Sequence, residues 1–173
     1  AHSEQWIQHL CTLRQFFVRV REANLTLRPT KCSIGYSCVK FLGFDISPQG
    51  LSPTPNNVNK ALNACRPETK TQLRSFLGMI GHYRRFIPNF AAVAVPLTDL
   101  TRKGSSNTLE WSDQHERAFV ALKRAITNPP ILRLPNVKET FVLQTDASNE
   151  GLGAVLLQEE EGFKYPIVYT SRK

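Results

Sequence analysis

The sequence predicts an α+β protein in which a helical section lies between a short β-rich section and a three-stranded antiparallel sheet. Two observations lead to this prediction. Apolar residues recur every three or four positions over most of residues 54–127, which is the period of a helix. Residues 140–170 instead contain short apolar runs separated by turn residues, which is typical of consecutive strands. With 173 residues, 41% of them hydrophobic, the chain is long enough to bury a core.

The first 51 residues are expected to form one helix followed by short strands. An apolar stripe with helical spacing covers residues 4–23, and Ser3 is the expected N-cap. Strands are expected over residues 25–27 and 39–42. The Ser-Pro-Gln-Gly sequence at residues 47–50 is a strong turn signal that closes this section.

Caps and prolines divide the helical section into separate helices. Pro55 suits the first position of a helix. A capping box at residues 69–72 starts a second helix, which Pro88 is expected to end. A shorter helix is expected over residues 90–100, and Ser112 caps a last one. The predicted buried faces of the second and last helices are Leu73, Phe76, Leu77 and Ile80, and Ala118, Phe119, Leu122 and Ile126.

The tail is expected to form three antiparallel strands over residues 140–146, 152–158 and 165–170, joined by turns at residues 148–151 and 159–162. This register places Glu159 opposite Thr140. Glu159 is then six residues along the strand from Asp146, or about 20 Å away.

The net charge of +8 is distributed unevenly. Residues 1–51 carry +3, residues 52–127 carry +6 and residues 128–173 carry −1. Such a surplus favours a polyanionic partner without naming it. The cations of the helical section either contact phosphates or form an ordinary solvated face. For a nucleic-acid-binding protein, log affinity falls linearly with log salt concentration. If both Arg84 and Arg85 contact phosphate, replacing them with Ala should lower the slope of this line by about two units.

Several residues in this section and its neighbours are unusual for their position. Gly78 and Gly81 each cost a helix about 1 kcal/mol, which predicts close approach by another element or by nucleic acid. Gly43 breaks an apolar strand and marks either a close approach or an ordinary bulge. Asp146 lies in a strand that is predicted to be buried, so it is either paired, hydrogen-bonded or metal-bound, or it caps the following turn.

The four cysteines and four histidines have no metal-ligand spacing, and the cysteines are expected to be buried thiols in a reducing compartment. No run of 18 apolar residues predicts a transmembrane helix.

An ordered set of short blocks runs along the chain. The blocks are Lys31-Cys32 followed by Phe41-Leu42-Gly43; Leu73-Arg74-Ser75-Phe76-Leu77-Gly78; Tyr83-Arg84-Arg85-Phe86-Ile87-Pro88; Pro96-Leu97; Trp111 with Ala118-Phe119 and Leu122-Lys123; and Thr145-Asp146-Ala147-Ser148 with Gly151, Gly153-Ala154-Val155-Leu156 and Gln158. With these blocks the sequence resembles the central part of the pol polyprotein of a gypsy-type LTR retrotransposon, from the end of the reverse-transcriptase palm into the RNase H domain. The resemblance covers nearly the whole chain.

The resemblance implies a role for each section. Residues 1–51 would end the palm, residues 52–103 would be a helical thumb, residues 104–135 the connection, and residues 136–173 the first strands of an incomplete RNase H-like domain. Asp146 would be the first RNase H carboxylate, catalytic and metal-binding, in a site that holds two Mg²⁺ ions in the intact parent. The implied nucleic-acid-binding residues are the primer-grip strand Phe41, Leu42, Gly43 and Phe44, and the thumb residues Lys70, Arg74, Gly78, Gly81, Arg84 and Arg85.

Two residues depart from the family pattern. His82 stands where the family usually has Tyr, and Phe44 stands where it often has His. Both changes are expected to affect packing more than chemistry.

The resemblance implies a fragment that binds template-primer nucleic acid, either an RNA/DNA hybrid or a DNA duplex, within a longer polyprotein. The parent would carry out RNA-directed DNA synthesis and would hydrolyse RNA in hybrids. The polymerase Asp pair is absent from the sequence, and the family places the other RNase H acids beyond the segment that matches Lys173, so the fragment is expected to be inactive by itself. The implied location is the cytoplasm, within a virus-like particle, with a nuclear phase.

Two other interpretations remain open. A domesticated relic would act as a non-enzymatic nucleic-acid-binding or protein-interaction module. A purely structural helical domain would show no salt-dependent affinity for nucleic acid.

Overall fold

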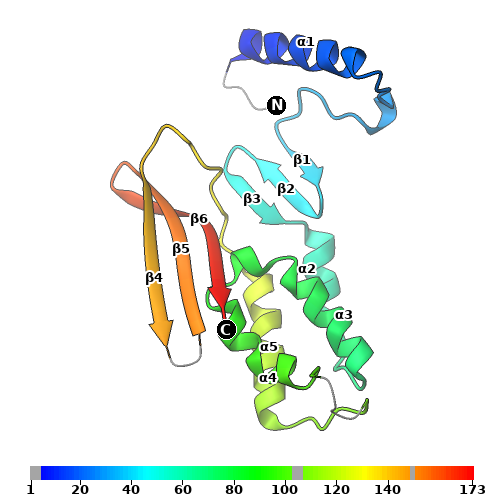
Figure 1. The fold of residues 1–173 in the computed structure, drawn as a ribbon, viewed down its shortest axis with the longest axis vertical. Coiled ribbons are helices and arrows are strands. Elements are labelled where there is room, and N and C mark those ends of the chain that lie inside the picture. The colour runs from blue at the N-terminus through cyan, green and yellow to red at the C-terminus, as the bar shows by residue number, and fades with distance from the viewer. Residues whose placement is uncertain (1–4, 103–106, 149–150) are drawn as a thin grey trace. The chain divides into compact units, whose positions relative to one another are not determined.

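The computed structural model describes residues 5–102, 107–148 and 151–173 (Figure 1). Within these ranges the chain forms five α-helices and two three-stranded antiparallel sheets, which confirms the predicted α+β class. The predicted cap Ser3 and the turn residues 149–150 lie outside the described residues. The chain divides into two compact units, residues 1–36 and residues 37–173.

The first unit contains helix α1 (Trp6–Glu22) and a short 3₁₀ turn, η1 (Pro29–Lys31). Helix α1 matches the predicted helix, but none of its residues is buried and its apolar stripe is exposed. The strand predicted over residues 25–27 is wrong, because this stretch has no regular secondary structure. Strand propensity alone does not form a strand, since the backbone groups need a neighbouring strand as partner.

The second unit begins with a small antiparallel sheet. It consists of β1 (Val39–Phe41), β2 (Phe44–Ser47) and β3 (Gly50–Pro53), paired in that order. Strand β3 is also bridged to the segment after the last helix, since Leu51 and Leu132 exchange backbone hydrogen bonds of 2.7 and 3.0 Å. The predicted section boundary between residues 51 and 52 falls inside β3.

Four α-helices and one 3₁₀ turn follow. They are α2 (Pro55–Leu62), α3 (Lys70–Gly81), η2 (Arg84–Phe86), α4 (Phe90–Asp99) and α5 (Asp113–Thr127). Both predicted caps are present, because Thr69 and Ser112 each open a capping box. Helix α3 ends at Gly81 and not at Pro88 as predicted. The backbone tightens into η2 before it reaches the proline, so residues 82–85 leave the helix and contact other elements.

The core is formed mainly by these helices. Residues predicted to be buried on α3 and α5 are buried there, except that Leu77 is only partly buried. Phe44 joins the core from β2 and Leu132 from the segment after α5. The small sheet is therefore attached to the helices by its own side chains.

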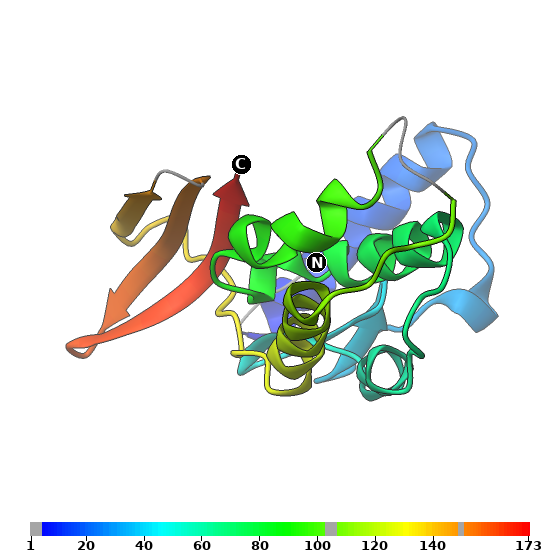
Figure 2. The same cartoon turned by 90° about the horizontal axis from the view of Figure 1, so that it is seen from below.

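The second sheet contains β4 (Phe141–Ser148), β5 (Gly151–Glu160) and β6 (Phe163–Arg172), in that order. Its register is the predicted one: Phe141 pairs with Gln158, which places Thr140 opposite Glu159. Figures 1 and 2 show β6 beside the helices and β4 on the far side of the sheet. Contacts of β6 with η2 and α4 attach this sheet to the helical section.

The four cysteines are free and exposed, so the prediction of buried thiols is wrong. Cys11 lies on the uncovered helix α1, and the other three lie outside helices and strands. No helix in the described ranges combines the length and the apolar character needed to cross a membrane.

Candidate nucleic-acid interface

Residues 41–44, the predicted grip strand, form the turn of the β1–β2 hairpin. Leu42 and Gly43 are the two turn residues, with φ values of 50° and 85°, between the paired Phe41 and Phe44. Positive φ at both positions of a two-residue loop is typical of a type I′ hairpin turn. Gly43 therefore marks a hairpin turn and not a bulge, and it is tightly packed, because a Cβ atom added there would lie 2.8 Å from the Tyr83 hydroxyl. We call residues 41–44 the hairpin tip.

The hairpin tip has one buried residue and two exposed apolar residues. Phe44 is 8% exposed and packs into the core, whereas Phe41 is 60% and Leu42 is 70% exposed. An aromatic and an aliphatic side chain held in solvent on a tight turn are suited to contact the sugar or base of a nucleotide. One side of the hairpin tip is thus held in the core, and the other side is exposed to solvent.

Both carbonyl groups of the turn are held by side chains that follow α3. Nε2 of His82 lies 3.0 Å from the Leu42 carbonyl oxygen, and because a carbonyl only accepts, this nitrogen carries the hydrogen. The Tyr83 hydroxyl donates to the Gly43 carbonyl at 3.2 Å. It accepts a hydrogen bond of 2.7 Å from Nδ2 of Asn57 in α2. Burial raises the pKa of Tyr83, and the bond from Asn57 offsets part of that shift.

His82 and Phe44, the two residues expected to depart from the family pattern, lie against each other. The rings of Phe44 and His82 stack with centroids 4.9 Å apart and planes 22° apart. Tyr83 meets the Phe44 ring edge-on, with the centroids 5.4 Å apart. The expectation that both changes affect packing is consistent with this contact, because the two residues form one stacked pair.

The exposed face of α3 contains Gly78. A Cβ atom added at Gly78 or Gly81 would meet no other described element within 4 Å. Close approach by another part of the described chain, one of the two predicted explanations for these glycines, is therefore ruled out for the described residues. Arg74, one turn before Gly78, is exposed on the same face.

The cationic residues that are predicted to contact nucleic acid differ in the partners that they have within the chain. Lys70 is buried, and its ammonium donates to the Arg102 carbonyl at 3.0 Å. Arg84 is exposed as well, but its guanidinium donates at 2.7 Å to the carbonyl of the buried Ser171, in a partly buried bond. Arg74 is exposed and donates to the Thr101 carbonyl at 2.9 Å. Arg85 is exposed, and its guanidinium carbon lies 5.6 Å from the centroid of the Phe44 ring. Arg74 and Arg85 are the better placed of these cations to contact a phosphate.

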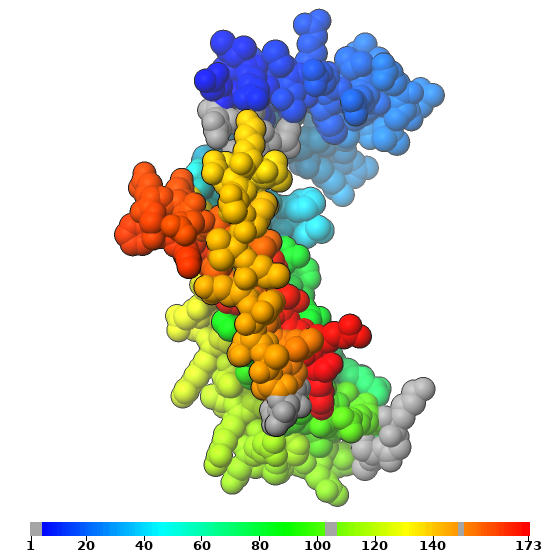
Figure 3. Space-filling model, turned by 60° about the vertical axis from the view of Figure 1, so that its left-hand side comes forward, coloured from blue at the N-terminus to red at the C-terminus, as the bar shows by residue number. Residues whose placement is uncertain are grey.

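Asp146 lies on the exposed strand β4, which corrects the prediction of a buried strand. All but one of the residues of β4 are exposed, and Figure 3 shows this strand on the surface. The strand is paired with β5 along one edge only, and an apolar sequence does not by itself supply a covering layer. In the ladder Asp146 is opposite Gly153. A pocket beside it is lined by Pro88 and Asn89, which precede α4, together with residues of the sheet.

The described carboxylates do not form a two-metal site with Asp146. Within the described ranges, no group of three or more His, Cys, Asp or Glu side chains could hold a metal ion. The register places Glu159 six residues along β4 from Asp146, whereas two catalytic ions lie only about 4 Å apart. The residues present therefore do not fit the implied pair of Mg²⁺ ions, and no chemical step follows from them.

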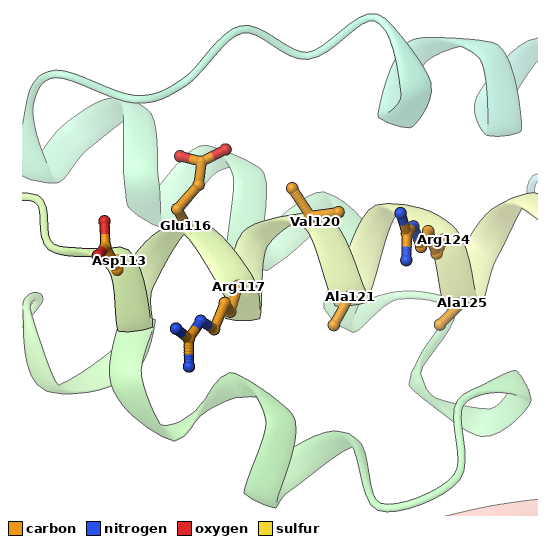
Figure 4. A pocket seen from close by; sticks show the side chains of 7 residues that line it. All are labelled: Asp113, Glu116, Arg117, Val120, Ala121, Arg124 and Ala125. Carbon is orange, nitrogen blue, oxygen red and sulfur yellow. The ribbon is translucent and has the colours of Figure 1, made fainter.

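A further surface groove of about 850 Å³ runs along α5. Figure 4 shows that its lining side chains all project from this one helix. Two acidic residues, Asp113 and Glu116, lie toward the start of the helix, and two basic ones, Arg117 and Arg124, follow. This mixed charge gives no preference for a polyanion, and none of the predicted site residues lies in the groove.

Sequence reasoning missed the residues that hold the hairpin tip. Tyr83 continues the buried stripe of Phe76 and Ile80, and a hydroxyl on a buried face is a signal for a hydrogen-bonding partner. No local sequence pattern indicates that Asn57 is the partner of the Tyr83 hydroxyl, because the two residues lie 26 positions apart. The expected departure of His82 from the family pattern does not indicate its partner, the Leu42 carbonyl 40 residues away.

Comparisons with known proteins agree on one group. The RNase H-like domain found in reverse transcriptase matches residues 111–173. The retrovirus-related Pol polyprotein from transposon 297 of Drosophila melanogaster is 38% identical over 165 residues, which are 95% of this chain and 15% of that protein. The transposon Tf2-3 polyprotein of Schizosaccharomyces pombe is 33% identical over 173 residues, which are 99% of this chain and 13% of that protein. The chain thus spans about one seventh of the length of these relatives.

Solved structures of foamy viral protease-reverse transcriptase have the same fold over this segment. In the complex with an RNA/DNA hybrid, 23% of that chain aligns with 99% of this one, at a TM-score of 0.81 and 27% sequence identity. In a complex with double-stranded DNA, 36% of that chain aligns with 99% of this one, at a TM-score of 0.79 and 27% identity.

Proposed function

Since this chain belongs to the retrotransposon Pol polyproteins and carries the RNase H-like domain found in reverse transcriptase over residues 111–173, we propose that it binds a template-primer duplex. The duplex is an RNA/DNA hybrid or double-stranded DNA, bound without sequence preference. The contacts come from the hairpin tip and from the exposed face of α3.

The uncovered glycine face of α3 is the observation that carries this proposal. Two glycines in one helix cost about 2 kcal/mol of helix stability together. The described chain offers no packing that would require them, because neither approaches another described element. Because glycine has no side chain, another backbone can come close to the helix at these two positions. A sugar-phosphate backbone is the partner that the surrounding charge favours.

The charge of the helical section supports a phosphate backbone as that partner. Residues 52–127 carry +6, and Arg74 and Arg85 are exposed near the two ends of α3. The contacts would be made to phosphates and sugars, which carry no sequence information. The solved foamy viral reverse transcriptases that share this fold are complexes with double-stranded DNA and with an RNA/DNA hybrid, which further supports a duplex.

In the longer polyprotein we assign this segment to an enzyme that carries out RNA-directed DNA synthesis and hydrolyses the RNA strand of hybrids. Asp146 would join carboxylates from elsewhere in the polyprotein, and Mg²⁺ would supply the Lewis acid when all of them are present. The remainder of the polyprotein is thus a partner of this segment. We propose the cytoplasm as its location, within a virus-like particle, with a nuclear phase.

The experiment is a salt titration of binding by the whole 173-residue chain. Affinity for a fluorescent RNA/DNA hybrid and for a DNA duplex is measured over a range of salt concentrations. Released counterions should make log affinity fall linearly with log salt. Arg74→Ala and Arg85→Ala should each reduce the slope by about one unit and weaken binding equally for different sequences.

The matched control is Lys138→Ala, which removes one exposed positive charge from the acidic tail. It should leave the slope unchanged. Salt-independent affinity, or no affinity at low salt, would contradict the proposed function.

A further inference from the structure

Three consecutive residues after α3 each form a hydrogen bond with a backbone carbonyl of another element. His82 bonds the Leu42 carbonyl and Tyr83 bonds the Gly43 carbonyl, both in the hairpin tip. Arg84 bonds the Ser171 carbonyl in β6. These residues are 40 and 87 positions from their partners, so a single short segment joins two distant parts of the chain. We call residues 82–84 the junction segment.

The contact between Arg84 and Ser171 is one part of a larger attachment of β6. Ser171 is only 6% exposed, and its hydroxyl accepts a 2.8 Å hydrogen bond from the Ala91 amide at the start of α4. The Arg84 guanidinium lies 5.9 Å from the centroid of the Phe90 ring. Because Ser171 is held through both its carbonyl and its hydroxyl, the end of β6 is fixed against η2 and α4.

The turn before α4 also packs against β4 and β5, the paired strands at the level of Asp146. Asn89, the N-cap of α4, has a left-handed backbone with φ of 50°. A Cβ atom added at Gly153 would collide with Oδ1 of Asn89. Gly153 is the residue opposite Asp146 in the ladder. The turn before α4 therefore lies against the sheet at the level of Asp146.

We propose that Arg84 is a positioning residue and not a phosphate contact, and that the junction segment holds the sheet carrying Asp146 at a fixed distance from the hairpin tip. The charge-assisted bond of Arg84 to a buried serine carbonyl is stronger than a neutral one. Its guanidinium is directed to the protein, so loss of Arg84 should release the sheet without removing a contact to nucleic acid.

The functional consequence rests on the proposed function. Asp146 would lie at a constant distance from the hairpin tip, measured along the axis of a duplex bound there. The distance would be constant because one rigid segment contacts both the hairpin tip and the sheet. Loss of Arg84 should make that spacing variable.

The experiment measures a distance within the whole chain. Spin labels are placed on cysteines introduced at Lys40 in β1 and Leu143 in β4, two exposed positions, after the four native cysteines are replaced by serine. The parent should give one narrow distance distribution. Arg84→Ala should broaden it and shift its mean, while the unfolding transition shows that the chain is still folded. Arg84→Lys keeps the charge but loses the planar fork, and should broaden it less.

Arg85→Ala is the matched control, because it removes the neighbouring arginine and leaves the Ser171 contact in place. It should leave the distance distribution unchanged. A distribution that stays narrow in Arg84→Ala, or that broadens equally in Arg85→Ala, would overturn the positioning role. A lower unfolding midpoint with an unchanged distribution would overturn it too.

A second readout separates this inference from the proposed function. In the salt titration, Arg84→Ala should keep the slope of the parent, whereas a phosphate contact would lose about one unit. A slope that is lower by about one unit in Arg84→Ala would show that Arg84 binds phosphate and would contradict the proposal. If the chain binds no nucleic acid at all, the proposed function fails, but the distance measurement still decides whether Arg84 fixes the sheet.

Discussion

At the scale of single residues, the hydroxyl of Tyr83 links three elements of the interface. It accepts from Asn57 in α2 and donates to the hairpin tip, while its ring packs against Phe44 in the core. A Cβ atom added at Gly43 would come within 2.8 Å of this hydroxyl, so the tip and the tyrosine fit closely. The conformation of the tip thus depends on a buried residue outside the hairpin.

Alkaline pH should destabilise the fold through Tyr83. Burial raises its pKa above the ordinary value of 10.0, so the folded state holds the phenolic proton more tightly than the unfolded state does. The stabilisation is therefore fully present below about pH 10 and is lost as the pH rises through the raised pKa. Urea unfolding of the parent and of Tyr83→Phe should show a smaller alkaline loss in the variant. Tyr36→Phe, a change at an exposed tyrosine, should leave the loss as in the parent.

Asp146→Asn should leave the stability of the chain nearly unchanged. A buried and unpaired carboxylate would make this change stabilising, but Asp146 is exposed. Surface substitutions of this kind change the free energy of unfolding by about 0.5 kcal/mol or less. Chemical unfolding of both proteins is the measurement. A gain of more than about 1 kcal/mol would show that the carboxylate is desolvated in solution.

The 173-residue chain should show no Mg²⁺-dependent hydrolysis of the RNA strand in a hybrid. The register separates Asp146 from Glu159 by far more than the spacing of two catalytic ions. A cleavage assay in Mg²⁺ and in Mn²⁺ tests this, with Asp146→Asn as the control for contaminating nuclease. Activity that is present in the parent and lost in the variant would show that the chain completes the site by itself.

At the scale of elements, α3 has a capped N-terminus and an exposed face on which glycine lowers the stability of the helix. Its capping box satisfies backbone donors at the first turn, and its apolar face packs into the core. The glycines lie on the other side, where a small propensity cost is not balanced by packing within the described chain. Stability and binding should therefore respond in opposite directions to substitution there.

Gly78→Ala should stabilise the chain and weaken its binding of nucleic acid. Alanine favours the helix by about 1 kcal/mol, and its methyl group meets open space in the free chain. In a complex the same methyl group would hold the backbone of the partner away. Ser75→Ala lies one turn earlier on the same exposed face but adds no bulk, so it is the matched control and should leave the affinity unchanged. An unchanged affinity in Gly78→Ala would exclude this face as the contact surface.

At the scale of the whole molecule, the core and both parts of the interface belong to the second unit. Every buried residue of the core lies between Phe44 and Leu132. Helix α1 contributes no buried residue. The stability of the second unit should therefore be independent of the first 36 residues.

Removal of residues 1–36 should leave the thermal midpoint of the remaining chain within about 2 °C of the parent, since a loss of 1 kcal/mol would shift it by several degrees. Calorimetry of the two proteins measures this. A single transition that moves down by more than about 5 °C would show that the first unit contributes to the core in solution.

The sequence by itself determined the helices and, in the tail, the order of the strands and their register, whereas strands β2 and β3 were not predicted. Capping residues and apolar periodicity act within a few residues, so Thr69 and Ser112 located two helix starts correctly. The tail register followed from its turns, and the structure has the predicted pairing of Phe141 with Gln158. The charge distribution predicts that residues 52–127 face a polyanion, which the salt titration tests.

Only the tertiary structure decided which side chains are available and which already have partners. Lys70 and Arg84 count as positive charges in the sequence, yet both donate to carbonyls of the chain itself. Asp146 lies in an apolar run that predicts burial, yet the strand is exposed because the described elements leave its side chains uncovered. These outcomes depend on contacts between residues tens of positions apart, which are set by how the elements pack and leave no local pattern in the sequence.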